Sequence, residues 1–201
     1  MLPTSLHFSL EESPAAIVLR LHSADGTNRL TQACVRSLIM AVEHLASHPK
    51  PLVVTGNSKF FSAGADLSEI AALTGPAAFE FSKMGQKLMD AIERFPATVC
   101  ASIEGYCMGG GLDLALACHW RIASPHAVFG HRGAALGLIT GWGGTQRLPR
   151  LIGKSRSRAM LVAAEKLNAS AALSIGLVDR VVGDPVQEAL RRMARSAEIS
   201  S

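Results

Sequence analysis

Residues Ala101 to Ser124, ASIEGYCMGGGLDLALACHWRIAS, decide the fold. The apolar stretch from Thr98 to Cys107 predicts a buried strand, Gly109 to Gly111 a tight turn, and Leu112 to Ala117 the start of a helix. A strand that passes through glycines into a helix exposes backbone N–H groups at the positive helix terminus, which suits developing negative charge on a ligand. A tight turn with no ligand gives the same pattern, so the glycines alone leave both interpretations open.

A second glycine-bearing loop, Ser62-Ala63-Gly64-Ala65-Asp66, again follows a buried strand and precedes a helical segment. One N–H group from each loop would together make an oxyanion hole. Removing a single donor from such a hole slows measured enzymes by about 100- to 1,000-fold. The sequence alone does not show whether the two loops converge.

The rest of the chain alternates strands, glycine-bearing loops and helices, which predicts an α/β fold. We expect one domain over residues 1–201, with its core at about residues 8–190. Six local predictions accompany this one: a strand pair within Leu6–Leu21, a helix opened by Asn28–Leu30 with Thr31 as N-cap, a helix over Ala77–Phe95, a helix over Ser155–Ala164, a glycine-punctuated connection from Gly141 to Gly153, and a last short helix from Val186 to about Met193.

Composition excludes several classes of protein. The net charge is +4, the basic residues are mostly scattered, and no nucleic-acid-reading motif accompanies them. No run of eighteen uncharged apolar residues and no signal peptide is present, so we expect a cytoplasmic protein that contacts neither membrane nor nucleic acid. The cysteines, Cys34, Cys100, Cys107 and Cys118, form no C-x-x-C pair and predict buried reduced thiols.

Four segments, taken together, resemble the enoyl-CoA hydratase/isomerase, or crotonase, family in order and spacing. They are VVTGNSKFFSAGADLSEI, ASIEGYCMGGGLDLALACHWRIAS, FGHRGAALGLITGWGGTQRLPRLIG and AALSIGLVDRVV. Asn28 with Leu30 resembles the early Asn-Ala-Leu signature of that family. The resemblance covers about residues 8–190 and implies a crotonase (ClpP-like) spiral of ββα units with a pocket for an acyl-CoA thioester. It also implies a homotrimer or hexamer, and no cofactor beyond the coenzyme A of the substrate.

The resemblance assigns the oxyanion hole to the backbone N–H groups of Ala65 and Gly110, which would stabilise an enolate-like thioester oxygen. The residues implied to line the path of substrate and coenzyme A are Ala63, Ala65, Asp66, Leu67, Ser68, Gly109 and Gly110.

The acid/base residues depart from the family pattern. Asp113 stands at the first glutamate position and remains a usable carboxylate. Gly133 replaces the second glutamate, and Gly141 stands where dienoyl-CoA isomerases have an aspartate. The remaining proton-transfer candidates are Asp113, His131 and His119, of which His119 is better explained by a structural role. No metal site is expected, because the histidine spacings match no compact ligand motif.

Three functions stay open at this stage. The first is an acyl-CoA-binding hydratase/isomerase whose hydratase activity is weak because of Gly133. The second is a decarboxylase of malonyl-type thioesters, in which loss of CO2 forms the enolate directly. The third is a catalytically silent acyl-CoA-binding or scaffold protein. The shortened C-terminal helical region further predicts a less covered, wetter pocket and puts trimerisation in doubt.

Overall fold

The computed structural model describes the backbone of residues 2–199 and the side chains of residues 2–196. Its larger sheet has the strand order β1-β2-β4-β7-β9-β12, with an antiparallel first pair and parallel neighbours thereafter. These strands are β1 (Phe8–Glu12), β2 (Ile17–Leu21), β4 (Leu52–Thr55), β7 (Val99–Ile103), β9 (Trp120–Ala123) and β12 (Arg180–Val181).

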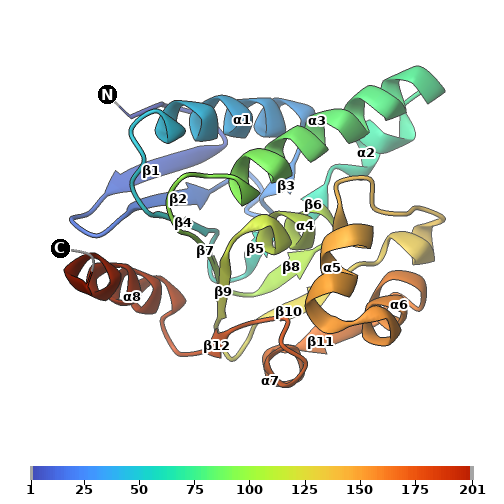
Figure 1. Cartoon of the computed structure of the whole chain (residues 1–201). Coiled ribbons are helices and arrows are strands. Elements are labelled where there is room, and N and C mark those ends of the chain that lie inside the picture. Colours follow the sequence, from blue (N-terminus) through green and yellow to red (C-terminus); the bar gives the residue numbers. More distant parts are fainter. Residues whose placement is uncertain (1, 200–201) are drawn as a thin grey trace.

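A smaller sheet has the order β11-β10-β8-β5, and β3 pairs with β6 separately. The bounds are β3 (Arg29–Leu30), β5 (Phe60–Ser62), β6 (Gly64–Ala65), β8 (Tyr106–Met108), β10 (Val128–Gly130) and β11 (Lys166–Asn168). Consecutive strands divide between the two sheets, since β4, β7 and β9 enter the larger sheet while β5, β8 and β10 enter the smaller one. A helical segment follows each pair, so the strand-strand-helix unit recurs along the chain (Figure 1).

The helices are α1 (Gln32–Ala46), α2 (Leu67–Ala71), α3 (Gly75–Glu93), α4 (Gly110–Ala117), α5 (Gly144–Ile152), α6 (Lys154–Val162), α7 (Ala169–Ser174) and α8 (Pro185–Ile199), with a 3-10 turn, η1, at Gly133–Leu136. In Figure 1, α1 and α3 run side by side above the larger sheet, and α8 lies away from them, packed against β4, β7 and β9.

Side chains of the larger sheet alternate between two hydrophobic clusters, as strand geometry requires. In β4, Leu52 and Val54 enter the main core, whereas Val53 enters a second cluster. Ala189 and Met193 of α8 complete that second cluster on the opposite face. Helical layers therefore bury both faces of the sheet, which accounts for its continuous apolar strands.

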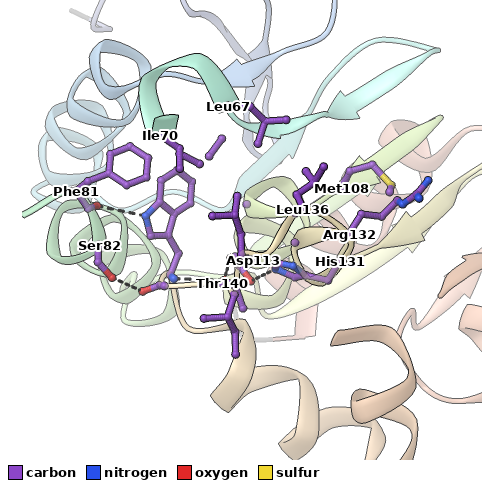
Figure 2. A pocket seen from close by; sticks show the side chains of 18 of the residues that line it. Leu67, Ile70, Phe81, Ser82, Met108, Asp113, His131, Arg132, Leu136 and Thr140 are labelled. Atoms are coloured by element: carbon purple, nitrogen blue, oxygen red, sulfur yellow. Dashed lines mark hydrogen bonds and ion pairs between the residues drawn. The ribbon is translucent and has the colours of Figure 1, made fainter. Parts of the chain in front are cut away.

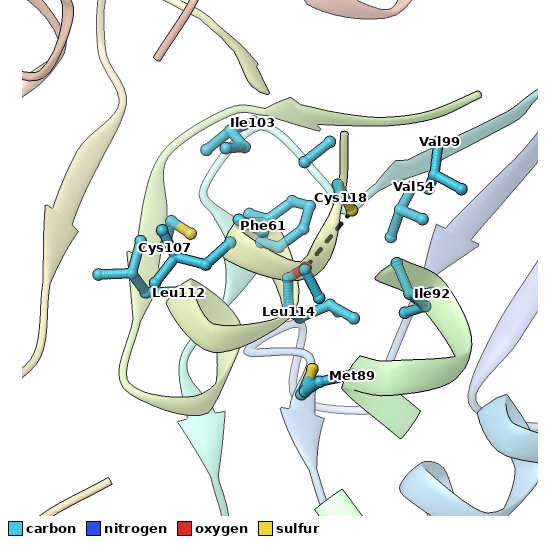
Figure 3. Packing of buried hydrophobic residues seen from close by; sticks show 14 of the residues in the cluster. Val54, Phe61, Met89, Ile92, Val99, Ile103, Cys107, Leu112, Leu114 and Cys118 are labelled. Atoms are coloured by element: carbon cyan, nitrogen blue, oxygen red, sulfur yellow. Dashed lines mark hydrogen bonds between the residues drawn. The ribbon is translucent and has the colours of Figure 1, made fainter. Parts of the chain in front are cut away.

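The central helix α4 is buried at every position from Gly110 to Ala117. Its Leu112 and Leu114 belong to the same cluster as Met89 and Ile92 of α3 and the inner strand residues (Figure 3). A helix enclosed in this way is fixed in position by packing on all sides. The polar residue that α4 carries, Asp113, is consequently held in one place.

Two expectations about local structure were wrong. The predicted strand from Thr98 to Cys107 is two strands, β7 and β8, because Gly105 has a φ of +59° and turns the chain between the sheets. Asn28 does not open a helix, since it has a φ of +53° and leads into β3. Helix α1 begins after Thr31, whose hydroxyl accepts from the Cys34 N–H as the predicted N-cap.

Two C-terminal expectations were also wrong in extent. The connection from Gly141 to Gly153 contains α5, which tolerates Pro149 in its final turn. The last helix, α8, is longer than the predicted segment from Val186 to Met193. None of the described helices is both long and apolar enough to cross a membrane.

Candidate active site

A cavity of about 330 Å³ opens where the two glycine-bearing loops, α3 and the segment from residue 131 to 142 meet. Figure 2 shows two ends of different character. Phe81 and Ile70 lie on one side, His131, Arg132 and Met108 on the other, and Asp113 with Thr140 between them. The end that holds Phe81 and Ile70 is mainly apolar, and the other end carries the imidazole and guanidinium groups together with Met108 and Leu136.

The two glycine-bearing loops converge in the structure. A β-carbon at Gly64 would lie 3.0 Å from the Gly110 nitrogen, and one at Gly110 would lie 3.3 Å from the Ala65 nitrogen. Gly110 is the first residue of α4, and the first N–H groups of a helix have no acceptor within the helix. The backbone nitrogens of Ala65 and Gly110 therefore lie close together beside the cavity that both residues line.

Each glycine of the triple has its own reason to be glycine. Gly109 has φ +52° and ψ −122°, a conformation that residues with a β-carbon rarely adopt. A β-carbon at Gly110 would stand 2.5 Å from the Trp142 ring, and one at Gly111 would stand 2.7 Å from the Ser62 carbonyl oxygen. Close approach to the cavity and to the neighbouring loop therefore excludes larger residues here.

Hydrogen bonds from Asn28 and Ser62 hold the loop that carries Ala65. The Asn28 side chain donates to the carbonyl oxygens of Phe60 at 2.8 Å and Phe61 at 3.2 Å. The Ser62 hydroxyl donates to the Asn28 carbonyl at 2.7 Å and accepts from the Gly64 N–H at 3.1 Å. The Asn-Ala-Leu-like signature thus fixes the position of one glycine-bearing loop.

Asp113 is buried, with 2% of its surface exposed, and both carboxylate oxygens have partners. Oδ1 lies 3.2 Å from His131 Nε2, and Oδ2 accepts from the Thr140 hydroxyl. His131 follows β10, whose Gly130 carbonyl accepts from the Gly109 N–H at 2.9 Å, so the second sheet delivers the imidazole beside α4. No group in the described part of the chain bonds His131 Nδ1, and the ring lines the cavity.

Neighbouring groups occupy the space beside Gly133 and Gly141. A β-carbon at Gly133 would lie 2.9 Å from the Leu138 carbonyl oxygen, and one at Gly141 would lie 2.5 Å from the Ser82 hydroxyl. The Gly141 carbonyl also accepts from Ser82 at 2.9 Å and from the Gln86 side chain at 2.7 Å. The backbone at both positions is packed against adjacent segments.

The sequence of the chain matches those of known proteins. Residues 11–200 match the profile described as enoyl-CoA hydratase/isomerase. The chain belongs to the enoyl-CoA hydratase/isomerase family. It is 38% identical over 176 residues to a crotonyl-CoA hydratase of Syntrophomonas wolfei, covering 86% of this chain and 68% of the relative. It is 33% identical over 195 residues to a probable enoyl-CoA hydratase of Bacillus subtilis, covering 96% and 75%.

Solved structures agree with this membership. Pseudomonas aeruginosa DspI superposes with a TM-score of 0.92 at 35% identity, covering 96% of this chain and 81% of that one. An enoyl-CoA hydratase of Bacillus anthracis gives 0.90 at 31% identity, covering 95% and 76%. The predicted crotonase spiral and superfamily are therefore confirmed.

Most of the residues predicted for an enoyl-CoA hydratase/isomerase site surround the cavity, namely Ala63, Ala65, Leu67, Gly109, Gly110, Asp113 and His131. Asp66 and Ser68 do not line it. The Asp66 carboxylate caps α2 by accepting from the Ser68 and Glu69 N–H groups, and the Ser68 hydroxyl bond holds the pKa of Asp66 below its usual range. This carboxylate is committed to the loop that carries Ala65.

His119 lies outside the cavity, with Nδ1 accepting from the Val99 N–H at 2.8 Å and Nε2 lying 3.1 Å from the Glu93 carbonyl oxygen. These bonds are structural. The described residues contain no cluster of histidine, cysteine, aspartate or glutamate fit to hold a metal ion.

Sequence reasoning missed Thr140, Trp142 and Phe81. Thr140 donates a hydrogen bond to Asp113, and the Trp142 and Phe81 rings meet at an interplanar angle of 43° with their centroids 5.2 Å apart, at the apolar end of the cavity. The signal available for Trp142 was a large aromatic residue between Gly141 and Gly143, where a turn usually carries small residues. For Thr140 and Phe81 no local signal exists.

Proposed function

We propose that the protein binds an acyl-CoA thioester and shifts a proton between carbon atoms near the thioester, as an isomerase of this family. The carbonyl oxygen would accept from the Ala65 and Gly110 N–H groups. The observation that carries the proposal is the single cavity that joins these two donors to the buried Asp113–His131 pair. Hydration of an enoyl-CoA would be a weak activity.

The two N–H groups favour the enolate over the neutral thioester. When a proton leaves the carbon next to the thioester, the C–H electron pair moves into the carbonyl and negative charge collects on its oxygen. Rigid donors already aimed at that oxygen need no reorganisation as the charge develops. Gly110 supplies its donor from the positive end of α4, which adds to the effect.

His131 would accept and return the proton. A carboxylate oxygen only accepts hydrogen bonds, so Asp113 holds the proton of the ring on Nε2 and leaves the Nδ1 lone pair free to act as the base. The proton that Nδ1 takes from one carbon is given back to the carbon two positions away, and the double bond moves with it. Neither a co-reactant nor a second base is required.

This arrangement favours isomerisation over hydration because hydration also requires a positioned water. Gly133 stands at the position where the family pattern has the glutamate that activates the water. Asp113 does not take over this role, because both of its carboxylate oxygens already have hydrogen-bond partners. One imidazole serves a proton shift, in which a single group acts first as base and then as acid.

Proton exchange tests the proposal without assuming a product. Butyryl-CoA incubated in D2O with the protein should gain deuterium next to the thioester, as measured by mass spectrometry. His131→Gln should retain binding and slow exchange by about 100- to 10,000-fold, the usual contribution of an acid/base residue. His126→Gln, at an exposed histidine outside the cavity, is the matched control.

Other results would select the alternatives. Binding without exchange in the wild type would refute the enzyme proposal and favour a silent acyl-CoA-binding protein. Exchange that His131→Gln leaves unchanged would remove the imidazole from the mechanism. Release of CO2 from malonyl-CoA, without isomerisation of 3-enoyl-CoA substrates, would favour the decarboxylase.

A further inference from the structure

We propose that the Trp142 indole ends the acyl-chain part of the cavity and restricts the site to short-chain acyl-CoA thioesters of about four to six carbon atoms. The inference rests on the proposed function, because it takes the thioester carbonyl to lie against Gly110. It adds a residue that sets substrate size, which the reaction itself does not require.

The indole is wedged between two helices. A β-carbon at Gly85 of α3 would stand 2.1 Å from the indole, and one at Gly110 of α4 would stand 2.5 Å from it. Trp142 Nε1 donates to the Phe81 carbonyl at 3.3 Å, and only 4% of the residue is exposed. Two glycines and a hydrogen bond therefore fix the ring across the gap between α3 and α4.

The surroundings of the indole suit an aliphatic chain. The side chains labelled at this end are those of Ile70, Phe81 and Ser82, and the Trp142 ring lies against Phe81 (Figure 2). Of the two groups proposed for proton transfer, His131 lies toward the other end and Asp113 lies between the two ends (Figure 2). Small-molecule sites usually have volumes of about 300–1,000 Å³. At about 330 Å³, this cavity lies at the small end of that range.

Gly110 links the chemistry to the size limit. The same residue supplies the proposed oxyanion N–H and contacts the Trp142 ring. A thioester oxygen held by Gly110 therefore starts its acyl chain close to the indole. Each further methylene gains contact with the apolar end until the chain reaches the ring, after which added length has no room.

Affinity measured against chain length tests the limit. The protein is titrated with butyryl-, hexanoyl-, octanoyl- and decanoyl-CoA in a calorimeter. The dissociation constant should fall about fourfold per methylene from butyryl- to hexanoyl-CoA. Octanoyl- and decanoyl-CoA should bind no more tightly than hexanoyl-CoA. Trp142→Phe and Trp142→Leu should extend the fall to octanoyl-CoA. Butyryl-CoA should lose affinity in these variants, because the enlarged apolar end is then incompletely filled.

Fluorescence gives a second measurement that needs no change at Trp142. The chain contains two tryptophans. Trp120 does not line the cavity, and the Arg192 guanidinium carbon lies over its ring, 4.7 Å from the centroid. In Trp120→Phe all tryptophan emission comes from Trp142. We expect hexanoyl-CoA to change this emission, and free coenzyme A to leave it nearly unchanged. In Trp142→Phe the emission of Trp120 should not respond.

The outcomes separate the two proposals. If no acyl-CoA thioester binds, the proposed function fails. If thioesters bind but the chain-length limit is the same in wild type, Trp142→Phe and Trp142→Leu, only the role of Trp142 is overturned. If the Trp142 variants fail to fold, binding to Trp120→Phe without any change in emission overturns that role in the same way.

Discussion

Two substitutions at Gly133, to glutamate and to alanine, separate the chemical effect of a carboxylate at this position from the effect of its size. Gly133 lines the cavity and begins η1, and a β-carbon there would lie 2.9 Å from the Leu138 carbonyl oxygen. Ordinary contacts of a β-carbon begin at 3.4 Å, a shortfall of about 0.5 Å. Gly133→Ala introduces this crowding alone, whereas Gly133→Glu introduces the same crowding together with a carboxylate.

The expected magnitudes follow from that shortfall. Overpacking of this kind destabilises a fold by about 1–3 kcal/mol, so both variants should unfold more easily than the wild type and by similar amounts. A well-placed acid/base residue contributes about 100- to 10,000-fold in rate, while a misplacement of about 1 Å loses about 100-fold. A displacement of about 0.5 Å should therefore lose about tenfold. The rate of hydration by Gly133→Glu should then exceed that by Gly133→Ala by roughly 10- to 1,000-fold.

The assay is loss of the conjugated absorbance of crotonyl-CoA, with thermal unfolding followed in parallel. The deciding quantity is the ratio of the hydration rates of Gly133→Glu and Gly133→Ala, because both variants carry the same displaced backbone. Equal hydration rates for Gly133→Glu and Gly133→Ala would show that the position no longer faces the reacting carbons. Wild-type turnover near the usual enzymatic value of about 10 per second would refute the premise that Gly133 weakens hydration.

Three further outcomes are expected. Asp113→Asn should slow deuterium exchange into butyryl-CoA at least tenfold, because an amide no longer selects the ring tautomer with a free Nδ1 lone pair; unchanged exchange would contradict this. Gly85→Ala should lower the melting temperature, because overpacking against the indole costs about 1–3 kcal/mol and outweighs the helix preference of alanine over glycine, about 1 kcal/mol. Gly75→Ala is the control and should not lower it, because a β-carbon at Gly75 meets open space. Burial raises the pKa of the Cys34 and Cys100 thiols to about 12, while unfolded thiols ionise near 8.5, so folding retains protons that the unfolded chain loses. The free energy of unfolding in urea should therefore fall as the pH rises above about 9, by about 1.4 kcal/mol per pH unit for each thiol, and Cys100→Ala should lessen the slope by that amount; equal slopes would contradict it.

The sequence predicted those parts of the site that short motifs specify. Two glycine-bearing loops after buried strands indicated a pair of N–H donors, the family resemblance assigned these donors to Ala65 and Gly110, and Asp113 lies one turn beyond the second loop. Such features depend on backbone conformation and neighbouring residues, which a linear pattern retains. The boundary at Gly105 was missed because an apolar run does not show where a strand leaves one sheet for another.

Contacts between distant segments were not predictable in this way. Thr140 is 27 residues from the carboxylate that it bonds, and the Trp142 indole donates to a carbonyl 61 residues away. Whether His131 would face the cavity depended on how β10 pairs with β8, since neighbouring strand positions point to opposite faces. Only the folded chain shows that the imidazole reaches Asp113.

The structure adds information about Gly133 and Gly141, the two positions where the family resemblance led us to expect acidic residues. Read in sequence, Gly133 and Gly141 are missing carboxylates in an otherwise intact site. In the fold, the Leu138 carbonyl approaches one position, and Ser82 packs against the other. A side chain at either position would therefore have to displace a neighbouring group. Asp113 and His131, a buried carboxylate and a buried imidazole in hydrogen-bond contact at the cavity, are accordingly where proton transfer should be sought first.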